Sequence, residues 1–313
     1  VSLCIRGAVV SLLVYVGLLG LTYFGFTTVP TGFIPSQDKG YLLVNAQLPD
    51  SASLQRTQEV MSRAEKIAKS MPGVKHTLTI AGQSFLLNAN GSNFGSMFVI
   101  LDEFHHRHDP SLSADVIGAK LRKQYFEEIQ EALIAVFGAP PVDGLGTAGG
   151  FKIMVEDRGD NGPAILQGQV ENLVEKGNQQ PGLVGLFTQF RANTPQLFVD
   201  VDRVKCKTMG VALDDVFSAL QTYLGSYYVN DFNRFGRTWQ VNLQADASFR
   251  ARPEDVQKLK VRNSTGDMVP IGTLATVKDS SGPVMVTRYN MYNAASINGA
   301  PAPGFSTGQA NAV

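Results

Sequence analysis

An unbroken apolar run near the N-terminus dominates the hydrophobic pattern of this chain. Residues 7–26, GAVVSLLVYVGLLGLTYFGF, contain no charged side chain. At ~1.5 Å per residue, a helix of this length crosses the ~30 Å hydrocarbon core of a bilayer. The run is longer than the usual apolar stripe of a soluble helix, and no clear A-x-A signal-peptide cleavage pattern follows it. The pattern predicts one transmembrane helix.

A basic residue orients this helix. Arg6 comes directly before the apolar run, and basic residues favour the cytoplasmic side of a membrane. We therefore expect the N-terminus in the cytoplasm and the chain after Phe26 on the opposite side, in the periplasm of a bacterial cell.

The next part of the chain alternates strand-like and helix-like segments. A Gly/Asn-rich stretch at 82–95 is expected to be a loop. Hydrophobic spacing predicts two helices, the first capped by Ser53, and four strands. The helices are expected at 54–71 and 113–129, and the strands at 41–49, 74–80, 96–101 and 133–137. This order, βαββαβ, is that of a four-stranded sheet with both helices on one face.

A similar pattern then begins again. A strand at 151–156, a helix at 163–179 and a strand at 183–190 follow one another, and a Pro-Gly pair ends the helix as another ends the first helix of the preceding unit. This is a weak internal repeat, for which the alternative is a coincidence of common turn residues.

The second unit does not continue as the first did. Strands, short helices and a hairpin fill residues 195–281, and a further strand is expected at 284–290. The expected segments are a strand at 196–202, a helix at 213–224, a hairpin at 227–246 with its tip at 231–236, a helical turn at 253–259 and strands at Val261 and 268–271. We interpret 195–281 as an insertion into a second βαββαβ unit, whose last helix and strand would be missing because the chain stops at Val313.

Composition excludes several classes of function. Lys plus Arg and Asp plus Glu each number 27, so no net field attracts nucleic acid, and none is expected as a partner. Cys4 and Cys206 are too far apart in sequence to suggest a disulfide framework or a zinc site. The chain contains no nucleophile-elbow, P-loop or dinucleotide-binding motif.

Clusters of titratable residues have simpler explanations than catalysis. The run His105, His106, His108 and Asp109 is more typical of a solvated turn than of a metal site. Charge at a helix N-terminus explains Asp214 with Asp215, and strand alternation explains Asp200 with Asp202. We therefore expect no catalytic residues, no metal and no cofactor, and the protein is not expected to be an enzyme.

Six segments in order carry a resemblance that covers nearly the whole chain. They are TVPTGFIPSQDKGYLLVNAQLPDSASLQRTQEV after the apolar run, LGTAGGF at 145–151, FRANTPQLFVDVDR at 190–203, LGSYYVNDF at 224–232, MVPIGTLA at 268–275 and RYN at 288–290. Together they resemble the resistance-nodulation-division (RND) multidrug efflux pumps of the AcrB type, the hydrophobe/amphiphile efflux family.

The resemblance implies an α+β fold. An N-terminal transmembrane helix would be followed by two ferredoxin-like βαββαβ porter subdomains, the second incomplete, with an inserted mixed α/β docking subdomain. The expected divisions are the helix at 1–30, the first porter subdomain at 38–142, the second at 143–194 and 282–313, and the docking subdomain at 195–281.

The resemblance also implies a function. The chain would be a fragment of a proton-driven transporter of amphiphilic small molecules in the bacterial inner membrane. Such a transporter works as a homotrimer in the lipid bilayer with a periplasmic adaptor protein and an outer-membrane channel. Its proton-coupling residues lie in other transmembrane helices, since the apolar run here has no ionisable residue.

By resemblance, residues 83–95 match a switch loop that separates two drug pockets. The matching positions for the distal pocket are Ile80, Phe85, Leu87 and Phe98. Those for the proximal entrance are Asn45, Phe137, Leu145, Thr147, Phe187 and Gln189. From the residues alone, core packing in strands is the favoured explanation of Phe98, Phe137 and Phe187.

The tip of the predicted hairpin combines aromatic and basic residues. Phe232 and Phe235 lie beside Arg234 and Arg237, and exposed apolar residues rimmed by charge mark partner surfaces. The resemblance implies that this hairpin inserts into a neighbouring protomer. The alternative is that both rings fold back onto their own subdomain.

Two other classes of function remain alternatives to transport. One is a membrane-anchored periplasmic assembly or binding module without transport activity. The other, less favoured, is a membrane-tethered enzyme.

Overall fold

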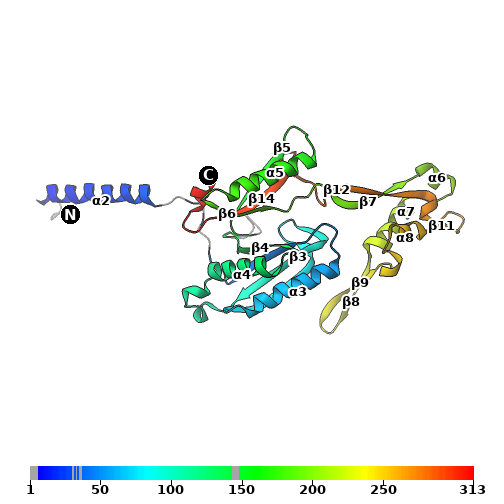
Figure 1. Ribbon diagram of the computed structural model, residues 1–313, viewed down its shortest axis with the longest axis horizontal. Helices are drawn as coiled ribbons and strands as arrows, with labels where there is room; N and C mark the ends of the chain where they lie inside the picture. Colours follow the sequence, from blue (N-terminus) through cyan, green and yellow to red (C-terminus); the bar gives the residue numbers. More distant parts are fainter. Residues whose placement is uncertain (1–5, 30–31, 33, 35–36, 143–147) are drawn as a thin grey trace. The chain divides into compact units, whose positions relative to one another are not determined.

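The computed structural model describes residues 6–29, 32, 34, 37–142 and 148–313 (Figure 1). Contacts between residues divide the chain into two compact units. The first comprises Val1–Ala192 with Pro283–Val313, and the second comprises Asn193–Gly282.

The predicted membrane helix is confirmed as a helix. Helix α2, Ala8–Thr28, has apolar side chains exposed around its whole circumference. The Thr22 hydroxyl donates to the Leu18 carbonyl at 2.8 Å, so the side-chain polar groups near the C-terminal end are bonded within the helix. Within the described residues, α2 is the one helix long and apolar enough to cross a membrane.

A four-stranded antiparallel sheet, the first sheet, follows α2 in the sequence. Its strand order is β2-β3-β1-β4, and helices α3 and α4 share one hydrophobic core with it (Figure 1). The elements are β1 (Tyr41–Gln47), α3 (Leu54–Ser70), β2 (Val74–Ser84), β3 (Ala89–Leu101), α4 (Ala114–Glu128) and β4 (Leu133–Gly138). The two predicted helices are confirmed to within a residue at each end.

Strand alternation decides which residues enter this core. Leu42, Val44 and Ala46 of β1 are buried in the core that also contains Met61 of α3 and Tyr125 of α4. The Tyr125 hydroxyl donates to the Ala64 carbonyl at 3.1 Å, which joins the two helices. Since side chains alternate along a strand, the odd-numbered residues of β1 point to the opposite face of the sheet.

The predicted Gly/Asn-rich loop at 82–95 is wrong for most of its length. Strand β2 continues to Ser84 and β3 begins at Ala89, so that a short turn at 85–88 joins them, with Asn88 in the left-handed region at φ 52°. Gly95 lies inside β3, where a Cβ would come within 2.5 Å of the Met61 sulfur. Glycine is used here for the close approach of α3 to the sheet, and not for a loop.

A second sheet is built around a strand that the sequence did not predict. Strand β14 pairs with β5, β6 and β13, and α5 packs on the sheet through Leu166 and Val170. The elements are β5 (Phe151–Asp157), α5 (Pro163–Asn178), β6 (Leu183–Thr188), β13 (Thr287–Tyr289), β14 (Tyr292–Pro301) and a short α10 (Thr307–Asn311). The strand expected at 284–290 is confirmed only at 287–289.

The turn between β13 and β14 suggests a stabilising substitution. Asn290 and Met291 both have positive φ, 48° and 72°, and Met291 is 87% exposed. A residue with a Cβ costs ~1 kcal/mol in this conformation and glycine does not, so Met291→Gly is expected to raise the free energy of unfolding by about 0.5–1 kcal/mol. Thermal unfolding of the purified protein measures the change. Met268→Gly, at an exposed strand position, is the control and should lower the free energy of unfolding. The explanation is contradicted if both substitutions stabilise the protein or if neither does.

The second unit has its own small core and begins and ends in paired strands. Strand β7 (Thr194–Val201) pairs with β12 (Ala275–Gly282) along its whole length. The core contains buried residues such as Cys206, Val216, Ile271 and Leu274. The remaining elements around it are α6 (Arg203–Thr208), α7 (Leu213–Leu220), α8 (Pro253–Lys258), β10 (Lys260–Arg262), β11 (Met268–Pro270) and α9 (Ile271–Leu274). The prediction of an α-helix over 213–224 is too long. Helix α7 ends at Leu220, and a π-helical turn, Gln221–Gly225, follows it.

Two aspartates of this unit, Asp200 and Asp202, have structural partners. Asp202 caps α6 by accepting from the Val204 and Lys205 amides at 3.0 Å, and Asp200 pairs with Lys278 at 3.2 Å. Cys206 is buried beside this cap, and its burial raises the pKa of the thiol.

The predicted hairpin is confirmed, with a narrower tip. Strands β8 (Tyr227–Arg234) and β9 (Arg237–Leu243) are joined by Phe235 and Gly236, both at positive φ. This is the geometry of a tight two-residue hairpin turn. Every residue of both strands is exposed, and Phe235, 81% exposed, lies against the Arg234 guanidinium.

Candidate functional site

The open face of the first sheet gathers several of the predicted site residues. Asn45 of β1 lies opposite Ser96 of β3, while Leu43 lies opposite both Phe98 of β3 and Phe137 of β4. Directly opposed residues on paired strands point to the same side of a sheet. Asn45, Phe98 and Phe137 therefore share the face that is turned away from the helical core.

The predicted distal residues lie toward the β2 edge of this face. The rings of Phe85 and Phe98 are 5.1 Å apart between centroids, in a tilted arrangement typical of favourable aromatic pairs. Ile80 lies opposite Ser96 on the neighbouring strand, and Leu87 belongs to the same turn as Phe85. All four side chains are half-buried.

Two buried serines that sequence reasoning missed hold this turn in place. The Phe85 amide donates to Ser96 Oγ at 3.2 Å, and the Leu87 amide donates to Ser84 Oγ at 3.3 Å. Ser84 Oγ in turn lies 2.9 Å from Asn45 Oδ1, so its proton is directed toward that amide oxygen. The alternation of β1 and β3 around Asn45 is the sequence signal that could have identified Ser96.

Residues from the second sheet complete the arrangement. The rings of Phe187 in β6 and Phe137 are 5.5 Å apart between centroids. Gln189 accepts through its backbone carbonyl from Gln47 Nε2 at 3.4 Å, and its side-chain Oε1 lies 3.3 Å from Ser84 Oγ. We call this group of contacts the seam; its residues are Asn45, Gln47, Ser84, Phe137, Phe187 and Gln189.

The seam contains two buried polar atoms whose hydrogen-bonding capacity is unused. Gln47 Oε1 and Gln189 Nε2 find no partner among the described residues. A buried polar atom without a partner costs ~1–3 kcal/mol. A bound group that donates to Gln47 and accepts from Gln189 would satisfy both atoms.

The chemistry available in the seam is that of binding. Its side chains are aromatic rings, amides and one hydroxyl, so none of them titrates near neutral pH. Such a surface can hold apolar and neutral polar groups, but it supplies no general acid or base.

A groove that sequence reasoning did not anticipate borders the seam at Gln47. It has a volume of about 680 Å³ and is lined mainly by the end of β1, the end of α4 and the start of β4. Its wall includes the exposed ring of Phe126, the exposed side chain of Leu133 and the basic side chain of Arg191.

The remaining candidates do not add to this site. Leu145 and Thr147 lie outside the described residues. In the histidine run, the rings of His105 and His106 are 4.0 Å apart, and His105 pairs with Glu103 at 3.4 Å. Among the described residues, no three or more His, Cys, Asp or Glu side chains are grouped to hold a metal ion.

Comparison with known proteins identifies relatives along the whole chain. The sequence model of the AcrB/AcrD/AcrF family matches residues 1–313. The chain is 33% identical over 303 residues to the toluene efflux pump membrane transporter TtgB of Pseudomonas putida, covering 96% of this chain and 28% of the relative. It is 32% identical over 305 residues to the multidrug export protein AcrF of Escherichia coli K12, covering 96% of this chain and 29% of the relative. The chain thus spans less than a third of the length of these curated relatives.

Proposed function

We propose that this chain, which belongs to the AcrB/AcrD/AcrF family, forms part of the substrate pathway of a proton-driven multidrug efflux transporter in the bacterial inner membrane. The observation that carries the proposal is the seam, which contains the paired rings of Phe137 and Phe187 and the unpaired amide atoms of Gln47 and Gln189. Apolar walls with a few neutral polar groups suit varied amphiphilic molecules, which share apolar area more than a hydrogen-bonding pattern.

We propose the following division of the chain. Residues 38–142 form a ferredoxin-like porter subdomain, which the strand order β2-β3-β1-β4 and the shared core of α3 and α4 support. Residues 143–194 and 282–313 form part of a second porter subdomain, supported by the pairing of β14 with β5 and β6. Residues 195–281 form the docking subdomain.

We assign two neighbouring substrate pockets, the distal one to the first porter subdomain and the proximal one to residues of both porter subdomains. Ile80, Phe85, Leu87 and Phe98 belong to the distal pocket, at the β2–β3 side of the open face. Asn45, Phe137, Leu145, Thr147, Phe187 and Gln189 belong to the proximal entrance, at the seam. The short turn at 85–88 separates the two, since Ser84 and Ser96 bind it to the sheet beside Asn45.

Transport by the complete protein tests the proposed function. The full-length transporter, produced with its adaptor and channel in a bacterial host that lacks its own efflux pumps, is expected to lower the accumulation of a fluorescent amphiphilic dye. A protonophore should abolish this effect, since the energy source is the proton gradient. Correctly inserted transporter that leaves dye accumulation equal to that of the empty host would refute the proposal.

The orientation of the chain has a direct test. Arg6 and the apolar helix α2 support a periplasmic location for the residues after Thr28. Alkaline phosphatase, which is active only after export, should therefore be active when fused after Asp160, and β-galactosidase fused at the same residue should be inactive. A stable but inactive phosphatase fusion together with an active β-galactosidase fusion would place this region in the cytoplasm.

We further propose that the hairpin β8–β9 contacts a neighbouring protomer of a homotrimer, with the adaptor and the outer-membrane channel as further partners of the docking subdomain. Its aromatic residues Phe232, Phe235 and Trp239 are exposed in the single chain. Arg234 and Arg237 flank the tip, and aromatic and arginine side chains are enriched where interfaces derive most of their energy.

The double substitution Phe232→Ala with Phe235→Ala is expected to weaken trimer formation and to leave the subdomain folded, because neither ring is buried in the small core of the unit. Chemical cross-linking in membranes measures the trimer, and thermal unfolding measures the fold. Phe249→Ala removes an exposed ring outside the hairpin and should leave the trimer unchanged. An unchanged trimer in the double variant, or loss of its fold, would exclude the interface role.

A further inference from the structure

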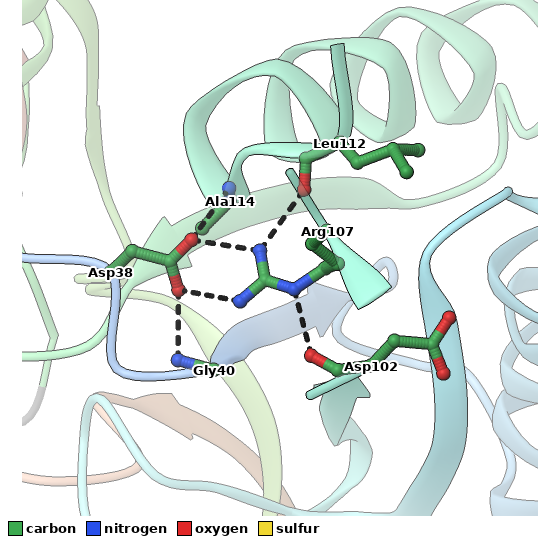
Figure 2. A network of polar contacts seen from close by, with 6 residues as sticks. All are labelled: Asp38, Gly40, Asp102, Arg107, Leu112 and Ala114. Atoms are coloured by element: carbon green, nitrogen blue, oxygen red, sulfur yellow. Dashed lines mark hydrogen bonds and ion pairs between the residues drawn. The ribbon is translucent and has the colours of Figure 1, made fainter. Parts of the chain in front are cut away.

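A buried polar network connects three distant segments of the first unit. Figure 2 shows Arg107, whose side chain is 2% exposed, facing the carboxylate of Asp38 with two nitrogens. Nη1 lies 2.8 Å from Oδ2 and Nη2 lies 3.1 Å from Oδ1. Arg107 also donates from Nε to the Asp102 carbonyl at 2.8 Å and from Nη1 to the Leu112 carbonyl at 3.0 Å. We call Asp38 and Arg107 with these partners the clasp.

Asp38 also acts as the missing cap of α4. The N-cap residue of this helix, Ser113, makes no side-chain capping bond. Instead, the amide of Ala114 donates to Asp38 Oδ2 at 3.1 Å, as the amide of Gly40 donates to Oδ1 at 2.8 Å (Figure 2). A carboxylate at a helix N-terminus satisfies a free amide and interacts favourably with the helix dipole.

The clasp is geometrically specific and remains charged at neutral pH. Two parallel bonds between a guanidinium and a carboxylate fix both distance and orientation. Burial alone raises the pKa of Asp38, but the hydrogen bonds from Arg107, Gly40 and Ala114 together lower it below its ordinary value. At neutral pH the carboxylate is therefore an anion and supplies the counter-charge of Arg107.

The position of the clasp in the sequence gives it a connection to the membrane. Asp38 lies between the end of α2 at Thr28 and the start of β1 at Tyr41. At ~3.5 Å per residue, the chain from Thr28 to Asp38 reaches at most about 35 Å, so a large displacement of α2 must pull on Asp38.

The segments that the clasp joins also carry the proposed pockets. Strand β1 starts just after Asp38 and contains Asn45, and β3 ends at Leu101, just before Asp102, and contains Phe98. Helix α4 starts at the amide that Asp38 caps, and the chain after it continues into β4 with Phe137. A force on Asp38 therefore reaches all three segments through hydrogen bonds and not through one strand alone.

We propose that the clasp of Asp38 and Arg107 transmits movement of the membrane helix α2 to the sheet that carries the substrate pockets. Its hydrogen bonds tie Asp38 to the start of β1, the end of β3 and the start of α4. Arg107 is a positioning residue, and the inference rests on the proposed transport function. Without the clasp, substrate would still bind, but displacement of α2 would stretch the connecting chain before it moved the sheet.

The experiment uses the full-length transporter and separates binding from turnover. Arg107→Met removes both the positive charge and the two parallel hydrogen bonds of the guanidinium. Arg107→Lys keeps the charge but cannot form both hydrogen bonds. Asp38→Asn keeps the shape of the side chain that caps α4 but removes its negative charge. Lys75→Met breaks an exposed ion pair with Glu103, 3.1 Å long, on the same sheet and is the control. Dye binding to the purified transporter gives Kd, and dye efflux from cells gives the maximal rate at matched amounts of folded protein.

The expected result is a loss of turnover with little change in binding. Arg107→Met should lower the maximal efflux rate at least tenfold with Kd within about twofold of the wild type. Arg107→Lys and Asp38→Asn should retain intermediate rates, and Lys75→Met should behave as the wild type. Hydrogen exchange at the Gly40 and Ala114 amides should accelerate in Arg107→Met, which verifies that the clasp has opened.

A second variant covers the case in which Arg107→Met does not fold. Four residues, Gly-Ser-Gly-Ser, inserted between Gln37 and Asp38 leave the clasp intact but add slack between it and α2. This variant is expected to bind dye normally and to lose turnover in the same way.

Two results would overturn the inference. In the first, the efflux rate of every folded variant falls only as far as its dye binding or its amount of folded protein falls. The clasp would then have a purely structural role. The second is normal turnover in both the slack variant and Arg107→Lys. Failure of the wild-type protein to export dye would refute the proposed transport function instead, so the two failures are distinguishable.

Discussion

Replacing Phe85 and Phe98 together with alanine is expected to weaken the binding of bulky amphiphilic substrates about tenfold or more. The two rings face each other at 5.1 Å on the open face of the first sheet and are half-buried. A half-buried aromatic side chain contributes roughly 1 kcal/mol of apolar contact, and about 1.4 kcal/mol corresponds to a factor of ten in affinity. Both rings lie outside the buried core that α3 and α4 form with the sheet, so the fold should persist.

Dye binding to the purified full-length transporter measures this effect, and resistance of the host to bulky drugs provides a second reading. Phe249→Ala is the control, because it removes an aromatic ring that is 65% exposed and belongs to neither proposed pocket. If resistance falls only as the amount of folded protein falls, the two phenylalanines are packing residues and do not contact substrate.

The largest loss of stability is expected from Gly150→Ala. Gly150 comes directly before β5 and has φ 105°, a conformation that a residue with a Cβ adopts only under strain. An added Cβ would also overlap the backbone carbonyl oxygen of Gly299 in β14, which cannot rotate away as a side chain can. The edge of the second sheet would have to separate, at a cost of about 3 kcal/mol or more.

Gly138→Ala is the natural comparison for this substitution. Gly138 ends β4, and a Cβ added there has no atom of the described residues within 4 Å. Thermal unfolding and the yield of inserted protein should distinguish the two variants, with near-normal values for Gly138→Ala. Equal stability of both would mean that the backbone around Gly150 adapts without strain.

Elements with a strong hydrophobic period could be predicted from the sequence. Helix α2 has no charged residue, and α3 and α4 place apolar residues at helical spacing, so local sequence determines both their type and their position. Strand β1 begins with four apolar residues, Tyr41 to Val44, which explains why its prediction was confirmed.

Strand β14 could not be predicted in this way. Its sequence, YNAASINGAP, is made of small and polar residues with little alternation in hydrophobicity. It is a strand because β5, β6 and β13 supply hydrogen-bonding partners, and two of these, β5 and β6, lie far away in the sequence. The same reason applies to β12, whose partner β7 comes before the whole of the second unit's core.

The candidate site could be predicted only in part. The aromatic residues were assigned by resemblance, and the structure brings Phe85 to Phe98 and Phe137 to Phe187. Gln47 and Ser84 were missed, because their role depends on Gln189, more than a hundred residues away. The clasp was missed for the same reason, since neither Asp38 nor Arg107 forms part of a local motif.

The pairing of β7 with β12 bears on how the second unit could be gained or lost. Thr194 lies opposite Gly282 in the register of these strands, so the points where the chain enters and leaves the unit are neighbours. A segment whose ends meet can be inserted with little stretching of the host chain, and insertions succeed at such sites. The same geometry would allow genetic exchange of residues 193–282: a unit of different sequence, or a simple two-residue turn, could replace them while β6 and β14 keep their pairing.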